Sequence, residues 1–197
     1  MLRDAFNGER EIKEKTKVYL PQSSGMTDKE YVAYLDRASY FNMTGRTVSG
    51  LVGSLFKRAP VISNWPKRFD KHLKNISKHN GTLLGFMKTC AQEQFAVGRY
   101  GVLVDREPSS DGKSYDPYLT GYVAENIIAW ETASVEGRER LVSLVLRETT
   151  TVSEFGKAAT TSLQYRHLYL GEHPEHPGEH VYIQDLYKNP EDGDAEL

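Results

Sequence analysis

The sequence predicts an α+β fold, in which N-terminal helices over about residues 2–97 are followed by a mainly antiparallel sheet over about residues 100–188. Apolar residues recur at helical spacing in the first half, whereas β-branched and aromatic runs separated by turn-rich pieces fill the second half. With 197 residues, of which 39% are hydrophobic, the chain has enough apolar material for a core. We expect a single α+β region over residues 1–197.

The first two helices are predicted from charge spacing and from a cap. We expect a helix over residues 2–18, supported by an ion pair between Glu11 and Lys15, which lie four positions apart. A capping box begins the second helix, because Thr27 is followed three positions later by Glu30. The apolar face of this helix has four members at helical spacing: Tyr31, Tyr34, Leu35 and Ala38.

Three more helices follow in the first half. One starts near Thr44, and its glycines either weaken it by about 1 kcal/mol each or allow a neighbouring element to approach closely. Another opens at Trp65-Pro66, where proline suits the first helical turn. Thr82 caps the last helix, which extends to about Ala96 and is closed by Gly98. Its predicted inward residues are Leu83, Met87, Cys90 and Ala91.

The stretch FAVGRYGVLVD, residues 95–105, does not have the order of a phosphate-binding loop. Such a loop needs a strand, then glycines, then a helix whose N-terminus supplies the N–H groups. Here a helix ends at Gly98 and a strand follows. Asp105 at the end of that strand is better explained as the start of a turn than as a catalytic carboxylate, because no second carboxylate stands at a suggestive spacing.

Three histidines in GEHPEHPGEH, at positions 173, 176 and 180, are the only cluster with metal-ligand character. Prolines and a glycine between them prevent a helix from holding all three on one face, so a solvated hairpin loop is the better interpretation. Cys90 falls in an apolar helical stripe and is more typical of a core residue than of a nucleophile. No run of about 18 apolar residues and no secretion signal is present. We therefore predict no enzyme activity, no metal and no cofactor.

The charge distribution indicates a nucleic-acid partner or a charge-matched assembly of copies, with two differently solvated surfaces as the alternative interpretation. Residues 1–100 carry 17 Lys and Arg against 9 Asp and Glu, a balance of +8, whereas residues 101–197 carry 8 against 18, a balance of −10. Residues 57–78 alone hold seven Lys or Arg and one acid, Asp70. A row of lysines at helical spacing in this segment can contact nucleic-acid phosphates without recognising a base sequence, or it can contact another partner. The alternative is that these lysines form a solvated face of the helix. Its members are Lys67, Lys71, Lys74 and Lys78.

Four ordered segments resemble the N-terminal part of portal proteins of short-tailed, double-stranded DNA bacteriophages, in particular a group known as a domain of unknown function. The segments are KVYLPQ, YLDRASYFNMTGRTVSGLVGSLFKRAPVI, EQFAVGRYGVLVD and PYLTGYVAENIIAWE. No single segment is diagnostic, but the four in this order with sensible gaps are specific. The resemblance runs from about Arg3 to about Leu146.

The resemblance implies a structural protein of the virion. Portals form rings of usually twelve copies at one capsid vertex, through which double-stranded DNA is packaged and ejected, and they do not hydrolyse ATP. Their partners are other copies of the same chain, the major capsid protein, scaffold, the large terminase subunit, and tail or adaptor proteins. Assembly takes place in the host cytoplasm, and no membrane is involved. An α+β portion near the N-terminus usually forms the outer wing of the ring.

The chain departs from the family in length. Full portals of this group are much longer, and no long stem helix or clip is recognisable after Thr149. We therefore expect a wing-like part of a longer portal chain, and we carry over no DNA-contacting position. The alternatives are a smaller head-completion or adaptor protein, or a capsid-associated structural protein, and a metal-dependent nuclease is disfavoured.

Overall fold

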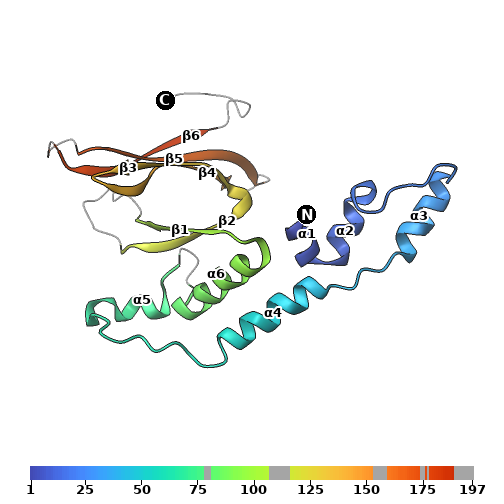
Figure 1. Ribbon diagram of the computed structural model, residues 1–197, viewed down its shortest axis with the longest axis horizontal. Coiled ribbons are helices and arrows are strands. Elements are labelled where there is room, and N and C mark those ends of the chain that lie inside the picture. Colours follow the sequence, from blue (N-terminus) through green and yellow to red (C-terminus); the bar gives the residue numbers. More distant parts are fainter. Residues whose placement is uncertain (78–80, 107–115, 153–158, 174–175, 177, 189–197) are drawn as a thin grey trace. The chain divides into compact units, whose positions relative to one another are not determined.

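The computed structural model describes residues 1–77, 81–106, 116–152, 159–173, 176 and 178–188 (Figure 1). The chain divides into two compact units, Met1–Gly121 and Tyr122–Leu197, which are described separately below. Helices occupy the first unit, and an antiparallel four-stranded sheet occupies the second. The predicted α+β class, with helices first and strands afterwards, is confirmed.

The predicted helix over residues 2–18 is broken into three pieces, which are α1 (Leu2–Asn7), α2 (Glu9–Glu14) and the 3₁₀ turn η1 (Thr16–Val18). Gly8 separates α1 from α2 at φ 101°, a conformation that only glycine adopts readily. The hydrogen-bonded partner of Lys15 is the carboxylate of Asp4, and Glu11 adds a weaker electrostatic attraction, so both raise the pKa of Lys15. The path of the N-terminal segment thus depends on the conformation of Gly8 and on the pairing of Lys15 with Asp4, eleven positions away.

The capping box at Thr27 is confirmed and begins α3 (Asp28–Arg37). The Thr27 backbone N–H donates to the Glu30 carboxylate at 2.9 Å, and the Glu30 N–H donates back to the Thr27 hydroxyl. Among the predicted apolar face of α3, Tyr31 is the buried member, and its hydroxyl donates to the carbonyl of Leu20 at 2.8 Å. This bond ties α3 to the segment that follows η1.

Helices α4 (Met43–Leu55) and α6 (Leu83–Val97) pack together, with Val48 of α4 and Ala96 of α6 buried. Asn42 caps α4 by accepting a hydrogen bond from the Gly45 N–H, and Thr82 caps α6 through the Gly85 N–H. The caps predicted at Thr82 and Gly98 are confirmed, with Gly98 in the left-handed conformation. A methyl group built on Gly50 or on Gly53 would meet no atom within 4 Å, so no element approaches α4 closely there.

The first unit also contains the 3₁₀ turn η2 (Lys67–Phe69), the short helix α5 (Asp70–Lys74) and a two-stranded sheet. That sheet pairs β1 (Tyr100–Asp105) with β2 (Tyr118–Val123), and the second strand ends just inside the next unit. Ser77 forms a parallel bridge with Leu119, which anchors the chain after α5 to β2.

The second unit is an antiparallel meander that follows the 3₁₀ turn η3 (Ala124–Asn126). Its strands are β3 (Ile127–Val135), β4 (Arg138–Val152), β5 (Thr160–Glu172) and β6 (His180–Lys188), in that order (Figure 1). Glu136 and Gly137 join β3 to β4 at φ 54° and φ 74°, which is the geometry of a two-residue type I′ turn.

Few hydrophobic side chains are buried in either unit. Among the described residues, the buried hydrophobic residues are Tyr31, Val48, Ala96, Tyr122 and Leu146. Twenty large hydrophobic residues within the same described ranges are exposed, on helices, on strands and in connections. A chain of this size normally buries far more of its apolar surface.

Candidate interaction surface

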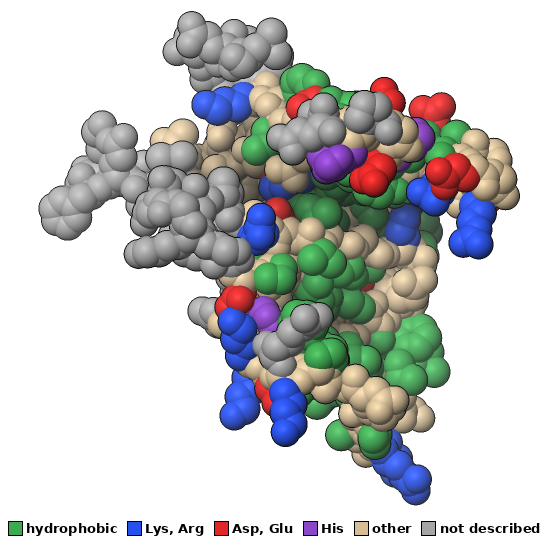
Figure 2. All heavy atoms as spheres, turned by 90° about the vertical axis from the view of Figure 1, so that its left-hand side faces the viewer, with side chains coloured by type: hydrophobic (Ala, Val, Ile, Leu, Met, Phe, Trp, Pro, Cys, Tyr) green, Lys and Arg blue, Asp and Glu red, His purple; other side chains and the backbone are tan. Residues whose placement is uncertain are grey.

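The predicted lysine row begins in a segment with one aromatic side and one cationic side. Trp65 and Phe69 meet edge to face, with ring centroids 6.0 Å apart, and Phe69 lies 5.8 Å from the ring of His72, which is buried. The side chains of Lys67, Lys71 and Lys74 are exposed on the same short segment. Figure 2, which views the molecule from the side on which α5 lies in Figure 1, shows Lys and Arg side chains standing out from the surface.

The described lysines of the row do not lie on one helix, because Lys67 belongs to η2 and Lys71 and Lys74 belong to α5. The segment is a 3₁₀ turn followed by five α-helical residues, and the helix ends at Lys74 because Asn75 adopts φ −145° and ψ 82°. The next residue, Ile76, instead donates its backbone N–H to the carbonyl of Gly81, and its own carbonyl accepts from the N–H of Leu119. The structure therefore brings Lys67, Lys71 and Lys74 together on a short segment, whereas Lys78 lies outside the described residues.

One of these lysines already has a partner within the chain. The Lys71 ammonium pairs with the carboxylate of Asp116, both groups being exposed, and this hydrogen bond holds the pKa of Asp116 below its ordinary value. An exposed ion pair of this kind contributes little to stability and is screened by salt. The positive charge available to a partner thus comes from exposed Lys67 and Lys74 and from Lys57 and Arg58 further upstream.

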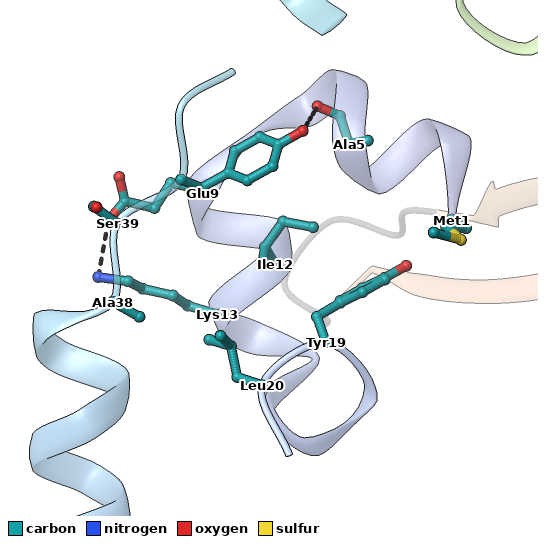
Figure 3. A pocket seen from close by; sticks show the side chains of 10 residues that line it. Met1, Ala5, Glu9, Ile12, Lys13, Tyr19, Leu20, Ala38 and Ser39 are labelled. Carbon is teal, nitrogen blue, oxygen red and sulfur yellow. Dashed lines mark hydrogen bonds and ion pairs between the residues drawn. The ribbon is translucent and has the colours of Figure 1, made fainter. Parts of the chain in front are cut away.

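A pocket of about 390 Å³ lies between the N-terminal helices and the chain that follows α3 (Figure 3). Its rim carries an ion pair of 2.8 Å between Glu9 and Lys13, and the Tyr40 hydroxyl donates to the carbonyl of Ala5 at 3.0 Å. The remaining lining is largely apolar and includes Ile12 and Leu20. With its charged groups paired on the rim, this pocket lacks the converging acidic or basic groups that catalysis would need.

The catalytic and metal candidates do not combine into a site. Asp105 ends β1 as predicted, and its carboxylate accepts from the N–H of Arg106 at 2.8 Å, as expected for a turn. Cys90 is half-buried in α6, where burial raises the pKa of its thiol, and a raised pKa disfavours the nucleophilic thiolate. Within the part of the chain that the structure describes, no three His, Cys, Asp or Glu side chains gather as metal ligands.

The histidine segment connects β5 to β6, as the hairpin interpretation predicts. The His173 N–H donates to the carbonyl of Glu179 at 2.7 Å, and the rings of His173 and His176 lie 4.7 Å apart. His180 is the first residue of β6 and is exposed. Two of the histidines are thus neighbours, and the third belongs to a strand.

Three polar clusters were not predicted from the sequence. Buried Asp4 accepts hydrogen bonds from Lys15 and from the Tyr19 hydroxyl, and these two bonds lower its pKa to about 2. Buried Glu93 of α6 pairs with Arg3 of α1 at 2.6 Å. Neither pair has a local spacing that would have revealed it.

The third cluster lies on the sheet of the second unit. Glu148 of β4 accepts from Arg166 and Gln164 of β5 at 2.6 Å each and from the Tyr122 hydroxyl at 2.5 Å. Burial opposes ionisation of Glu148, but these hydrogen bonds together hold its pKa below the ordinary value. Because the Glu148 carboxylate satisfies these three donors, the cluster is best explained as a stabilising hydrogen-bond network rather than a reactive site.

Comparisons with known proteins give no family for the chain. No protein-family model matches it, and no curated protein matches its sequence. Among the described residues, no helix is long and apolar enough to span a bilayer.

Proposed function

We propose that the chain is the wing-like part of a portal protein of a short-tailed, double-stranded DNA bacteriophage. Copies of the chain would form a ring, usually of twelve, at one capsid vertex, where it docks the large terminase subunit, tail or adaptor proteins, capsid protein and scaffold. The ring gives DNA a rigid passage during packaging and ejection. This role is mechanical and electrostatic, and it needs no catalytic group, metal or cofactor.

The observation that carries the proposal is the imbalance between buried and exposed hydrophobic side chains. The described residues expose twenty large hydrophobic residues and bury five hydrophobic ones. Exposed apolar residues in such number favour a chain that completes its core against other chains. The ordered resemblance of four segments to portal proteins then indicates which assembly the chain serves.

The charge split supports contacts between unlike halves of neighbouring copies. Residues 1–100 carry a balance of +8 and residues 101–197 a balance of −10. A ring closes through heterologous contacts, in which one surface of a copy meets a different surface of the next. Such a contact can place the positive half of one copy against the negative half of its neighbour.

Native mass spectrometry and negative-stain electron microscopy of the purified protein test this function. We expect a closed ring with a central hole, and assembly that weakens between about 50 mM and 1 M salt because added ions screen the opposed charges. Capture of the ring by a purified large terminase subunit would favour the portal over a head-completion adaptor. A monomer at all protein concentrations, or nuclease turnover with Mg²⁺ or Mn²⁺ that Asp105→Asn abolishes, would contradict the proposal.

A further inference from the structure

Helix α4 has one buried side and one outer side, and Arg46 near its N-terminal end is the only charged residue of the helix. Val48 is buried where α4 packs on α6, whereas Met43, Leu51 and Leu55 are 58%, 47% and 58% exposed. The other exposed members of this outer face are Thr47, Gly50 and Ser54. A helix face that meets water normally carries charged residues, so this composition is typical of a face that meets protein.

The outer face is also smooth. The space around a methyl group built on Gly50 is free of other atoms within 4 Å, so the helix surface there is flat and open. Small residues on a helix allow another element to come close to its backbone. Two further hydrophobic residues in the connection that follows the helix, Val61 and Ile62, are exposed as well.

The chain segment that forms this face contains cations and no carboxylates. Between Asp36 and Asp70 the sequence contains no Asp or Glu, whereas Arg46, Lys57 and Arg58 all fall within that stretch. The Arg46 guanidinium lies 5.1 Å from the ring of Phe41, at the N-terminal end of the face. The complementary surface must therefore be apolar at its centre and acidic at its border.

We infer that the outer face of α4 is the surface on which a second copy of the chain docks, through the acidic half of that copy. This inference rests on the proposed function and names the surfaces that it uses. The acidic half, residues 101–197, supplies 18 Asp and Glu against 8 Lys and Arg. It also presents Trp130, Tyr182 and Leu186 as exposed large hydrophobic residues, which gives the apolar centre that the contact needs.

Docking of α4 against the α4 of a second copy is disfavoured by charge. Such a contact would bring two Arg46 side chains and two Lys57-Arg58 pairs towards each other without a carboxylate between Asp36 and Asp70 to neutralise them. Docking against the acidic half uses two different surfaces, which is the arrangement that closes a ring.

A photo-crosslinker at Leu51 tests the contact directly. We would replace Leu51 by p-benzoylphenylalanine in an equal mixture of ¹⁴N-labelled and ¹⁵N-labelled chains, irradiate it, and map the linked peptides by mass spectrometry. We expect peptides of mixed isotope composition that join position 51 to residues 122–188. The matched control places the same probe at Val32 of α3, which is also an exposed hydrophobic residue, and we expect no such peptides there.

A substitution supplies the second measurement. Leu51→Glu places a carboxylate at the centre of the face, and we expect it to weaken assembly at least about tenfold, whereas Val32→Glu leaves assembly unchanged. Leu51 is exposed, so circular dichroism should show the fold retained. Links within single chains only, or rings that form normally with Leu51→Glu, would overturn the inference while leaving the proposed function standing. A wild-type chain that stays monomeric would overturn both.

Discussion

Replacing Arg166 by Met is expected to lower the free energy of unfolding of the β3–β6 sheet by about 3 kcal/mol. The Arg166 and Glu148 side chains are only 12% and 14% exposed, and they are joined by the 2.6 Å bond from Nε. Removing one partner of a buried ion pair costs about 3–5 kcal/mol, because the other charge stays buried without compensation. The bonds that Tyr122 and Gln164 still donate place the expected loss at the lower end of this range.

Urea unfolding followed by tryptophan fluorescence measures this loss. A Trp65→Phe background leaves Trp130 on β3 as the only tryptophan, so the signal reports the second unit. A double-mutant cycle with Glu148→Gln isolates the interaction between the two side chains. The matched control is Arg140→Met, which breaks the exposed pair with Glu136 and should change stability by less than about 0.5 kcal/mol.

The pH dependence of the same variant gives an independent check. The folded-state pKa of Glu148 lies below its ordinary value of 4.5. Ionised Glu148 therefore contributes stability that is complete above that ordinary value and is lost as the pH falls through the lower folded-state pKa. Arg166→Met should make this loss of stability at acidic pH smaller. A decrease of less than about 1 kcal/mol in the free energy of unfolding, or a coupling energy near zero between Arg166 and Glu148, would refute the stabilising role of this cluster.

Three further predictions concern caps, glycines and acid stability. Thr27→Ala removes the acceptor of the Glu30 N–H and should lower the free energy of unfolding in urea by about 1 kcal/mol, whereas Thr27→Ser should retain most of it. Gly137→Ala should destabilise the fold by about 1–2 kcal/mol, because φ 74° is unfavourable for alanine, whereas Gly53→Ala should stabilise helix α4 by up to about 1 kcal/mol, because alanine favours a helix and meets no atom there. Thermal unfolding measures both changes, and a change in the same direction for both variants would contradict the prediction. The pKa of Asp4 is about 2, so ionised Asp4 should stabilise the fold above pH 3.8, its ordinary pKa, and this stabilisation should be lost as the pH falls through 2. Asp4→Asn should remove this loss of stability from the acid-unfolding curve, and an unchanged curve would contradict the role of the Asp4 hydrogen bonds.

Prediction from the sequence succeeded where a residue and its partner are close in the chain. The predicted caps at Thr27 and Thr82 are present, and so is the predicted helix end at left-handed Gly98. It failed where a local pattern was extended too far. Helical spacing predicted one helix for the lysine row, but Lys67 lies in a 3₁₀ turn and the helix that holds Lys71 and Lys74 ends at Lys74.

Local sequence patterns predicted that helices precede strands, and they predicted the caps at Thr27 and Thr82, because these features depend on propensities and on contacts within about four residues. The meeting of distant polar groups depends on the tertiary fold instead. Arg3 pairs with Glu93 across 90 positions, and Glu148 meets Arg166 through the register of β4 on β5. No local spacing encodes such partners, since they are selected by the path of the whole chain and by the burial that makes an unpaired charge costly. The outer face of α4 belongs to the same category, because Val48, Leu51 and Leu55 are all apolar in the sequence and only the packing of α4 buries Val48 and leaves the other two exposed.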